Sequence, residues 1–129
     1  VIGGTAFGHC YGLTGITKPE GITDVGYYSF YDCTGLQEIN LPDRLTVIHA
    51  GTFRECTSLT SFRLPENLTV FDSNPLHGCS ALTEIVVSPG NHNFNFTDGI
   101  LFDASGTELL CYPGGRHEES YTVPDGVIT

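Results

Sequence analysis

Five cysteines carry the most reactive side chains of this 129-residue sequence, and four of them recur at a fixed spacing. Cys10, Cys33, Cys56 and Cys79 are each 23 residues apart, whereas Cys111 lies outside that series. If the chain coils once per period, these four residues lie in a line about 4.8 Å apart. Tetrahedral zinc requires four sulfurs within about 2.3 Å of one point, so a shared metal site does not fit.

Disulfides between neighbouring cysteines of the series are harder to dismiss. The Cα separation is permitted, but parallel Cβ vectors stay farther apart than a disulfide normally allows. We therefore expect a ladder of buried, reduced thiols that pack as small apolar side chains. In an apolar stack, a Cys56→Ser replacement would leave a buried hydroxyl without a partner.

Other residues that could support chemistry lack the necessary spacing. No Ser-His-Asp or paired-carboxylate arrangement recurs with the histidines, so we expect no catalytic residues and no enzymatic activity. Asp98, Asp103 and Glu108 lie near a glycine-rich turn but match no known calcium loop, and turn chemistry explains them. The sequence therefore predicts no metal site and no cofactor.

Charge and hydropathy exclude two classes of partner. Fifteen acidic and five scattered basic residues give a formal net charge of −10, which disfavours nucleic acid. No apolar run approaches the roughly 18 residues of a membrane-spanning helix, so we expect no membrane insertion. Sixteen glycines, seven prolines and no methionine or tryptophan favour strands and turns.

The elements that must position these residues follow from the same 23-residue period. Aligned columns run through the chain as Phe7, Phe30, Phe53 and Leu76; Leu13, Leu36, Leu59 and Leu82; Ile16, Ile39, Phe62 and Ile85; Pro19, Pro42 and Pro65; and Ile2, Val25, Ile48 and Phe71. Within one unit, the apolar spacing from Leu59 to Leu64 predicts a strand that Pro65 ends. A second extended piece over 68–71 carries the chain back, which predicts a solenoid with two parallel ladders.

The motif from Ile2-Gly3 through Ala6-Phe7, Cys10, Leu13 and Ile16, repeated more fully from Val25 to Pro42, resembles the BspA-like, or treponemal-type, leucine-rich repeats. The resemblance implies a β-rich α/β solenoid, a right-handed leucine-rich-repeat superhelix of 23-residue units. Lys18, where later units have leucine, is expected to loosen the first coil, and Pro75-Leu76 replaces the usual Ala-Phe pair.

The fifth unit is longer than the others. Ile85 and its counterpart Tyr121 are 36 residues apart, and two apolar runs, 100–103 and 108–112, flank a turn. This pattern predicts a β-hairpin, and the family resemblance implies the same insertion. We expect one domain over 1–129, with regular units to about residue 84, the enlarged unit at about 85–120 and a further unit beginning at 121–129.

The ends of the chain fall in mid-coil on this division. The sequence is therefore expected to be a fragment of a longer array with apolar edges at both ends. Head-to-tail self-association of those edges is possible.

Outward strand positions form the candidate ligand-binding surface. The residue types at these positions vary from unit to unit, whereas the buried columns keep apolar residue types. The positions are Glu38, Asn40, Ser61, Arg63, Glu84 and Val86. An unused, solvated face would vary in the same way, and the hairpin of the enlarged unit is an alternative site. A mixed-charge or aromatic patch along these positions would favour binding.

The family resemblance supplies the functional hypothesis. It implies an extracellular, cell-surface module that acts in adhesion by binding a matrix or cell-surface protein through the exposed strand face. The alternative, from a different class, is a ligand-free structural spacer that presents another domain.

Overall fold

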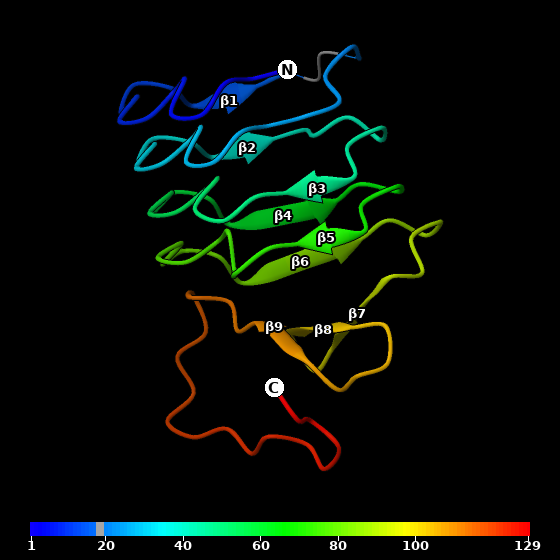
Figure 1. Ribbon diagram of the computed structural model, residues 1–129. Coiled ribbons are helices and arrows are strands. Elements are labelled where there is room, and N and C mark those ends of the chain that lie inside the picture. Colours follow the sequence, from blue (N-terminus) through cyan, green and yellow to red (C-terminus); the bar gives the residue numbers. More distant parts are fainter. Residues whose placement is uncertain (18–19) are drawn as a thin grey trace.

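Short strands at the predicted spacing give the chain its architecture (Figure 1). A computed structural model describes residues 1–17 and 20–129, so the expectations for Lys18 and Pro19 lie outside the described residues. Successive turns of the chain stack below one another, with the strands β1 (Gly15–Ile16), β2 (Glu38–Ile39), β4 (Ser61–Leu64) and β6 (Glu84–Val87) on one side. Strands β3 (Val47–Ile48) and β5 (Val70–Phe71) lie on the return path.

All pairings within the stack are parallel and join residues 23 apart. Gly15 is in register with Glu38, Ser61 with Glu84, and Val47 with Val70. An isolated parallel bridge between Ile2 and Val25 extends the return-path series. Leucine-rich-repeat packing thus forms two parallel series of short strands around one core.

The helical component of the expected α/β class is wrong for the described residues, which contain strands and turns and no helix. The turns that close each coil explain why. In the second coil, Tyr28 and Asp32 adopt φ values of 55° and 57°, and right-handed helix cannot run through left-handed residues four apart. The Tyr31 N–H donates instead to the Tyr28 carbonyl at 3.1 Å, which closes a tight turn.

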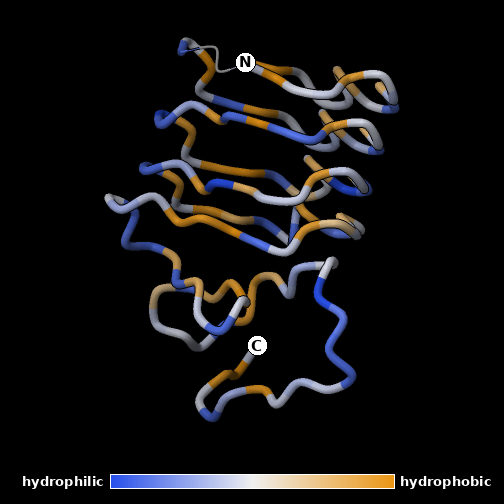
Figure 2. Tube along the Cα trace, turned by 180° about the vertical axis from the view of Figure 1, so that it is seen from behind, coloured by the Kyte–Doolittle hydropathy of each residue, from blue (hydrophilic) through white to orange (hydrophobic). Residues whose placement is uncertain are grey.

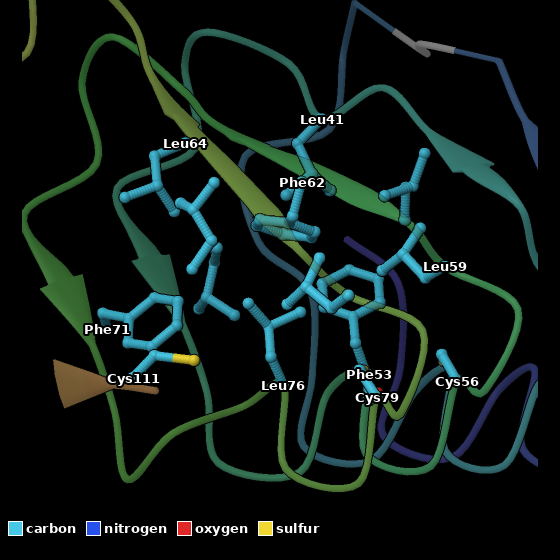
Figure 3. Close-up of a cluster of buried hydrophobic side chains, with 14 of the residues drawn as sticks. Leu41, Phe53, Cys56, Leu59, Phe62, Leu64, Phe71, Leu76, Cys79 and Cys111 are labelled. Atoms are coloured by element: carbon cyan, nitrogen blue, oxygen red, sulfur yellow. The ribbon is translucent and has the colours of Figure 1, made fainter. Parts of the chain in front are cut away.

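Aromatic stacking joins the coils through the core. The Phe7 and Phe30 rings lie 5.1 Å apart with an interplanar angle of 4°, and Phe30 and Phe53 lie 5.3 Å apart at 6°. Phe30 is 1% exposed, whereas Phe7, in the first coil, is 36% exposed. Figure 3 shows Phe53 and Phe62 beside the leucines that fill the same interior, and Figure 2 shows hydrophobic stretches recurring at the same place in successive turns.

The cysteine ladder is free of disulfides, with Cys33, Cys56, Cys79 and Cys111 buried and Cys10 partly buried. Three of these thiols have a partner that the sequence did not reveal. The Cys33 Sγ donates to the Phe7 carbonyl at 3.0 Å, and Cys56 and Cys79 repeat the contact with Phe30 and Phe53 at 3.2 Å. The expectation that a Cys56→Ser hydroxyl would lack a partner is therefore wrong, because the Phe30 carbonyl faces that position.

The enlarged unit contains the expected hairpin, with β8 (Ile100–Asp103) antiparallel to β9 (Leu109–Cys111). A third strand, β7 (Phe94–Thr97), was not predicted and pairs with β8 through a two-residue turn. Asp98 and Gly99 occupy that turn with φ values of 52° and 78°. Two consecutive left-handed residues match the twist of a tight hairpin, which is why an Asp-Gly pair suits this place.

The chain after β9 carries no strand over 112–129 and is tied at one place to the stacked coils and at another to the β8–β9 turn. The Gly115 N–H donates to the Leu82 carbonyl at 2.7 Å, which holds this segment against the fourth coil. A Cβ on Gly115 would lie 2.6 Å from the same carbonyl oxygen, so only glycine permits the approach. Near the end, the Ile128 N–H donates to the Thr107 carbonyl at 2.8 Å.

Burial of the thiols predicts alkaline destabilisation. Burial raises the pKa values of Cys79 and Cys111 from 9.0 to about 12. Their contribution to stability is complete below pH 9, and it is lost as the pH rises toward 12 because the unfolded chain ionises first. We expect the free energy of unfolding to fall by up to about 1.4 kcal/mol per pH unit for each thiol, measured by urea denaturation.

A variant with Cys79→Ala and Cys111→Ala provides the control. Its slope of stability against pH should be shallower than that of the parent protein between pH 9 and 11, whatever its absolute stability. Equal slopes for the two proteins would contradict this account of the ladder.

Candidate functional site

The six strand-face residues predicted from the sequence all lie exposed on the stack. Side chains alternate between the two faces of β4, which explains this exposure: Phe62 and Leu64 are buried, whereas Ser61 and Arg63 point outward. The parallel register places Ser61 beside Glu84 and Arg63 beside Val86. Glu38 belongs to β2, and Asn40 follows that strand.

Four of the six residues surround one hollow of about 310 Å³, which Glu38, Asn40, Ser61 and Arg63 line together with Gln37 and Ile39. A neighbouring hollow of about 590 Å³ shares Gln37, Glu38 and Ser61 and extends toward Thr57 and Ala81. Glu84 and Val86 line neither hollow. The strand face is therefore recessed between β2 and β4.

Charge on this face is mixed. Glu38 and Glu84 contribute carboxylates, and Arg63 contributes the one cation of the six predicted residues. The Arg63 Nη1 lies 3.4 Å from the Asp43 Oδ1, and both side chains are partly exposed. Such a surface pair contributes at most about 1 kcal/mol, so it orients Arg63 more than it stabilises the fold.

Sequence reasoning missed two participants in this arrangement. Gln37 lines both hollows, and Asp43 pairs with Arg63. Gln37 precedes the strand residue Glu38 and is itself exposed, so extending the outward positions by one residue would have found it. Asp43 follows the strand-ending Pro42, and only the three-dimensional stacking places it beside Arg63.

The histidines bridge coils through carboxylates. The His9 Nδ1 lies 2.9 Å from the Asp32 Oδ2, and the His49 Nε2 lies 3.4 Å from the Asp24 Oδ1. The Tyr11 hydroxyl lies 3.2 Å from both the His9 Nδ1 and the Asp32 Oδ2. Over 1–17 and 20–129, no three side chains of His, Cys, Asp or Glu gather as a metal site would require, and no helix is long and apolar enough to span a bilayer.

The alternative site, the hairpin of the enlarged unit, is organised by Asp103. Its carboxylate accepts a hydrogen bond from the Ser105 hydroxyl and from the Thr107 and Glu108 N–H groups, the last two at 2.8 Å each. The Ser105 hydroxyl, followed by the Glu108 N–H, lowers the pKa of Asp103 from 3.8 to about 2. The carboxylate closes the turn between β8 and β9.

Arg116 ties the C-terminal segment to this unit. Its guanidinium contacts the Glu118 carboxylate, with Nη2 and Oε1 2.5 Å apart, and donates to the Asp98 carbonyl. The Tyr112 hydroxyl donates to the other Glu118 oxygen at 2.9 Å. The hydrogen bonds from Arg116 and Tyr112 lower the pKa of Glu118 from 4.5 to about 2.

The stacked strands, the 23-residue register and the Phe and Cys columns define a leucine-rich-repeat protein. A family model for the BspA type leucine rich repeat region matches residues 1–100 with six copies. The chain belongs to this family, which confirms the resemblance stated from its motifs. A search of curated proteins finds no match.

Solved bacterial structures share the fold. A leucine rich cell surface protein from Faecalibacterium prausnitzii A2-165 is 32% identical, with a TM-score of 0.86 over 98% of this chain and 33% of its own. The pneumococcal vaccine antigen PcpA is 26% identical, with a TM-score of 0.81 over 89% of this chain and 29% of its own. A leucine-rich-repeat protein from T. pallidum, 23% identical over 65% of this chain and 50% of its own with a TM-score of 0.52, shows the fold alone. This chain thus spans about a third of the first two proteins.

The Asp103 turn predicts acid sensitivity of the enlarged unit. Because its pKa is depressed, Asp103 stabilises the folded turn above pH 4, and that contribution is lost as the pH falls through about 2. Hydrogen exchange followed by NMR should show Thr107 and Glu108 amides losing protection over this range. Asp103→Asn should show reduced protection already at pH 6, whereas Asp125→Asn, a substitution of an exposed carboxylate, should not.

Proposed function

We propose that this module binds an extracellular protein, a matrix or cell-surface protein, through its strand face, and so acts in adhesion. The observation that carries the proposal is the recessed, mixed-charge surface on which Glu38, Asn40, Ser61 and Arg63 converge. Outward residues differ from coil to coil here, while the core columns beneath them are conserved in type. Repeat proteins use such extended faces for recognition because the backbone spacing is fixed and the side chains are free to vary.

The descriptions of two related structures support a cell-surface location. One is described as a cell surface protein and another as a vaccine antigen. We infer a cell-surface, extracellular location for the protein that contains this chain. Binding is the expected role rather than catalysis, because the strand face offers charge and shape but no aligned acid, base and nucleophile.

The finer architecture belongs to the same proposal. We infer a right-handed superhelix of 23-residue units to about residue 84, an enlarged unit at about 85–120, and a further unit begun by 121–129. The register offset in each parallel pair supports the period. Head-to-tail association remains an expectation for the partly exposed residues of the first coil.

A structural spacer is the second candidate function. The continuous core and the tightly stacked coils favour it, because a stiff array holds another domain at a fixed distance. A spacer requires no recess and no particular charge on its strand face. The two functions therefore differ in whether the strand face binds anything.

Substitution of the strand face tests the proposal. Glu38→Ala and Arg63→Ala should each weaken saturable binding to a partner selected from a panel of purified matrix proteins at physiological salt. Both should leave the melting temperature nearly unchanged, because exposed polar substitutions alter stability by less than about 0.5 kcal/mol. Surface plasmon resonance and thermal denaturation provide the two measurements.

Matched substitutions elsewhere control for charge. Glu119→Ala removes the same charge as Glu38→Ala from the C-terminal segment, and Arg54→Ala removes the same charge as Arg63→Ala from a turn. Neither should weaken binding. Loss of binding only from Glu119→Ala would transfer the site to the enlarged unit, and no saturable binding to any member of the panel would favour the spacer.

A further inference from the structure

A second exposed surface lies where the turns of the coils stack, on the edge opposite the strand ends (Figure 1). Four rings gather there around one carboxylate, and we call this set the aromatic edge: His9, Tyr11, Tyr28, Tyr31 and Asp32. The ring centroids of His9 and Tyr31 are 5.0 Å apart, those of His9 and Tyr11 6.0 Å, and those of Tyr28 and Tyr31 6.0 Å. The rings thus form one continuous contact series.

Asp32 holds the centre of the aromatic edge. Its Oδ2 accepts from the Tyr11 hydroxyl at 3.2 Å and lies 2.9 Å from the His9 Nδ1. These contacts join the first coil to the second and hold the carboxylate at the polar atoms of His9 and Tyr11.

The Tyr28 and Tyr11 rings are exposed to solvent and do not pack into the hydrophobic core. Tyr28 is 40% exposed and Tyr11 is 58% exposed. The coil that carries Tyr28 has described coils on both sides of it, so the exposure of Tyr28 does not arise from an end of the stack. Large exposed aromatic side chains with a polar tip are typical of protein-binding surfaces.

The turns of this edge contain left-handed residues, as the matching turns of the other coils do, with Thr5 and Asn74 at the phase of Tyr28 and with His9 and Glu55 at the phase of Asp32. Tyr28 adopts a φ of 55° at the phase where the next coil has Gly51, with a φ of 71°. Asp32, with a φ of 57°, occupies the phase where a later coil has Gly78, with a φ of 79°. Glycine accepts this conformation without strain, whereas a tyrosine does not. The left-handed conformation alone therefore does not require these side chains, although the Tyr28 ring also packs against Gly51 of the next coil.

Electrostatics define the kind of group that fits. Tyrosine faces carry negative potential, Asp32 adds a carboxylate, and the chain as a whole has a net charge of −10. Arg54, the basic residue that shares this edge, lies 3.9 Å from the Glu55 carboxylate through its Nε. A cation from outside would meet ring faces and a carboxylate together.

We propose that the aromatic edge binds an arginine- or lysine-bearing segment of a partner protein. The cationic group lies against the Tyr28 and Tyr31 rings, with Asp32 as its counter-charge. This combination of a cation over a ring and a charged hydrogen bond distinguishes a basic side chain from a neutral one. The surface is separate from the strand face and does not depend on the function proposed for it.

A short peptide tests this proposal directly. The probe is a blocked peptide with three arginines separated by glycines, and its control has citrulline in place of each arginine. Titration of the isotope-labelled chain, followed by NMR, should shift the amides of the 26–33 segment with the arginine peptide and leave them unchanged with the citrulline peptide. Tyr28→Gly and Asp32→Asn should each lower the affinity for the arginine peptide by about three- to ten-fold.

The variants separate binding from folding. Tyr28→Gly relieves the left-handed conformation but also removes the packing of the ring on Gly51, so thermal denaturation must show that the variant is folded before its affinity is compared. Asn also tolerates the left-handed conformation of Asp32. Arg63→Ala on the strand face and Glu119→Gln, which removes one distant charge, should leave peptide affinity unchanged.

Three results would overturn the proposal. The first is equal binding of the citrulline peptide, and the second is unchanged affinity in Tyr28→Gly. The third is saturable binding of a neutral oligosaccharide, or of a second copy of the chain, that shifts the 26–33 amides more strongly than the arginine peptide does. Failure of these tests would leave the strand-face experiment unaffected, because that experiment uses different residues and a different partner.

Discussion

Stacking of one coil on the next is the interaction on which the whole structure depends, because a single coil has no interior of its own. Each coil supplies one layer of the core, and the Phe30 ring lies between Phe7 and Phe53 at 5.1 and 5.3 Å. The Cys56 thiol meets the Phe30 carbonyl of the preceding coil at 3.2 Å. Side chains and backbone therefore fix the same spacing, and a residue of a different size in one layer would disturb the layers on both sides.

This constraint separates the positions that the fold fixes from those that function can use. Side chains at inward positions must be similar in size and polarity from coil to coil because they pack on one another. Ser61 and Arg63 on β4 face solvent and take no part in this packing. The turns contain a second kind of free position. Their left-handed residues differ in type from coil to coil, with glycine at 51 and 78 and tyrosine and aspartate at 28 and 32.

Sequence reasoning was strongest where the period repeats and weakest where it breaks. The columns of Phe, Leu and Cys identified the family and the outward phase of the strand face. The α component was wrong because paired left-handed residues such as Tyr28 and Asp32 are not obvious from single residues, although their alignment with Gly51 and Gly78 was a readable signal. Strand β7 was missed although Asp98-Gly99, between alternating aromatic and apolar residues, is a strong hairpin signal. The recess between β2 and β4 and the Arg63–Asp43 contact arise from stacking and leave no pattern in the sequence.

The enlarged unit shows how the chain departs from the repeat without losing the stack. Three antiparallel strands replace a simple coil, and their hydrogen bonds are satisfied among themselves rather than by the preceding coil. The unit is joined to the stack by the Gly115 N–H, which meets the Leu82 carbonyl at 2.7 Å where a Cβ would not fit, and by the Asn91 amide, which donates to the Pro65 and Leu68 carbonyls. Arg116 and Glu118 fix the segment that contains Gly115 to the β7–β8 turn. Because each coil contacts chiefly its neighbours, this change of architecture leaves the strand face and the aromatic edge of the earlier coils undisturbed.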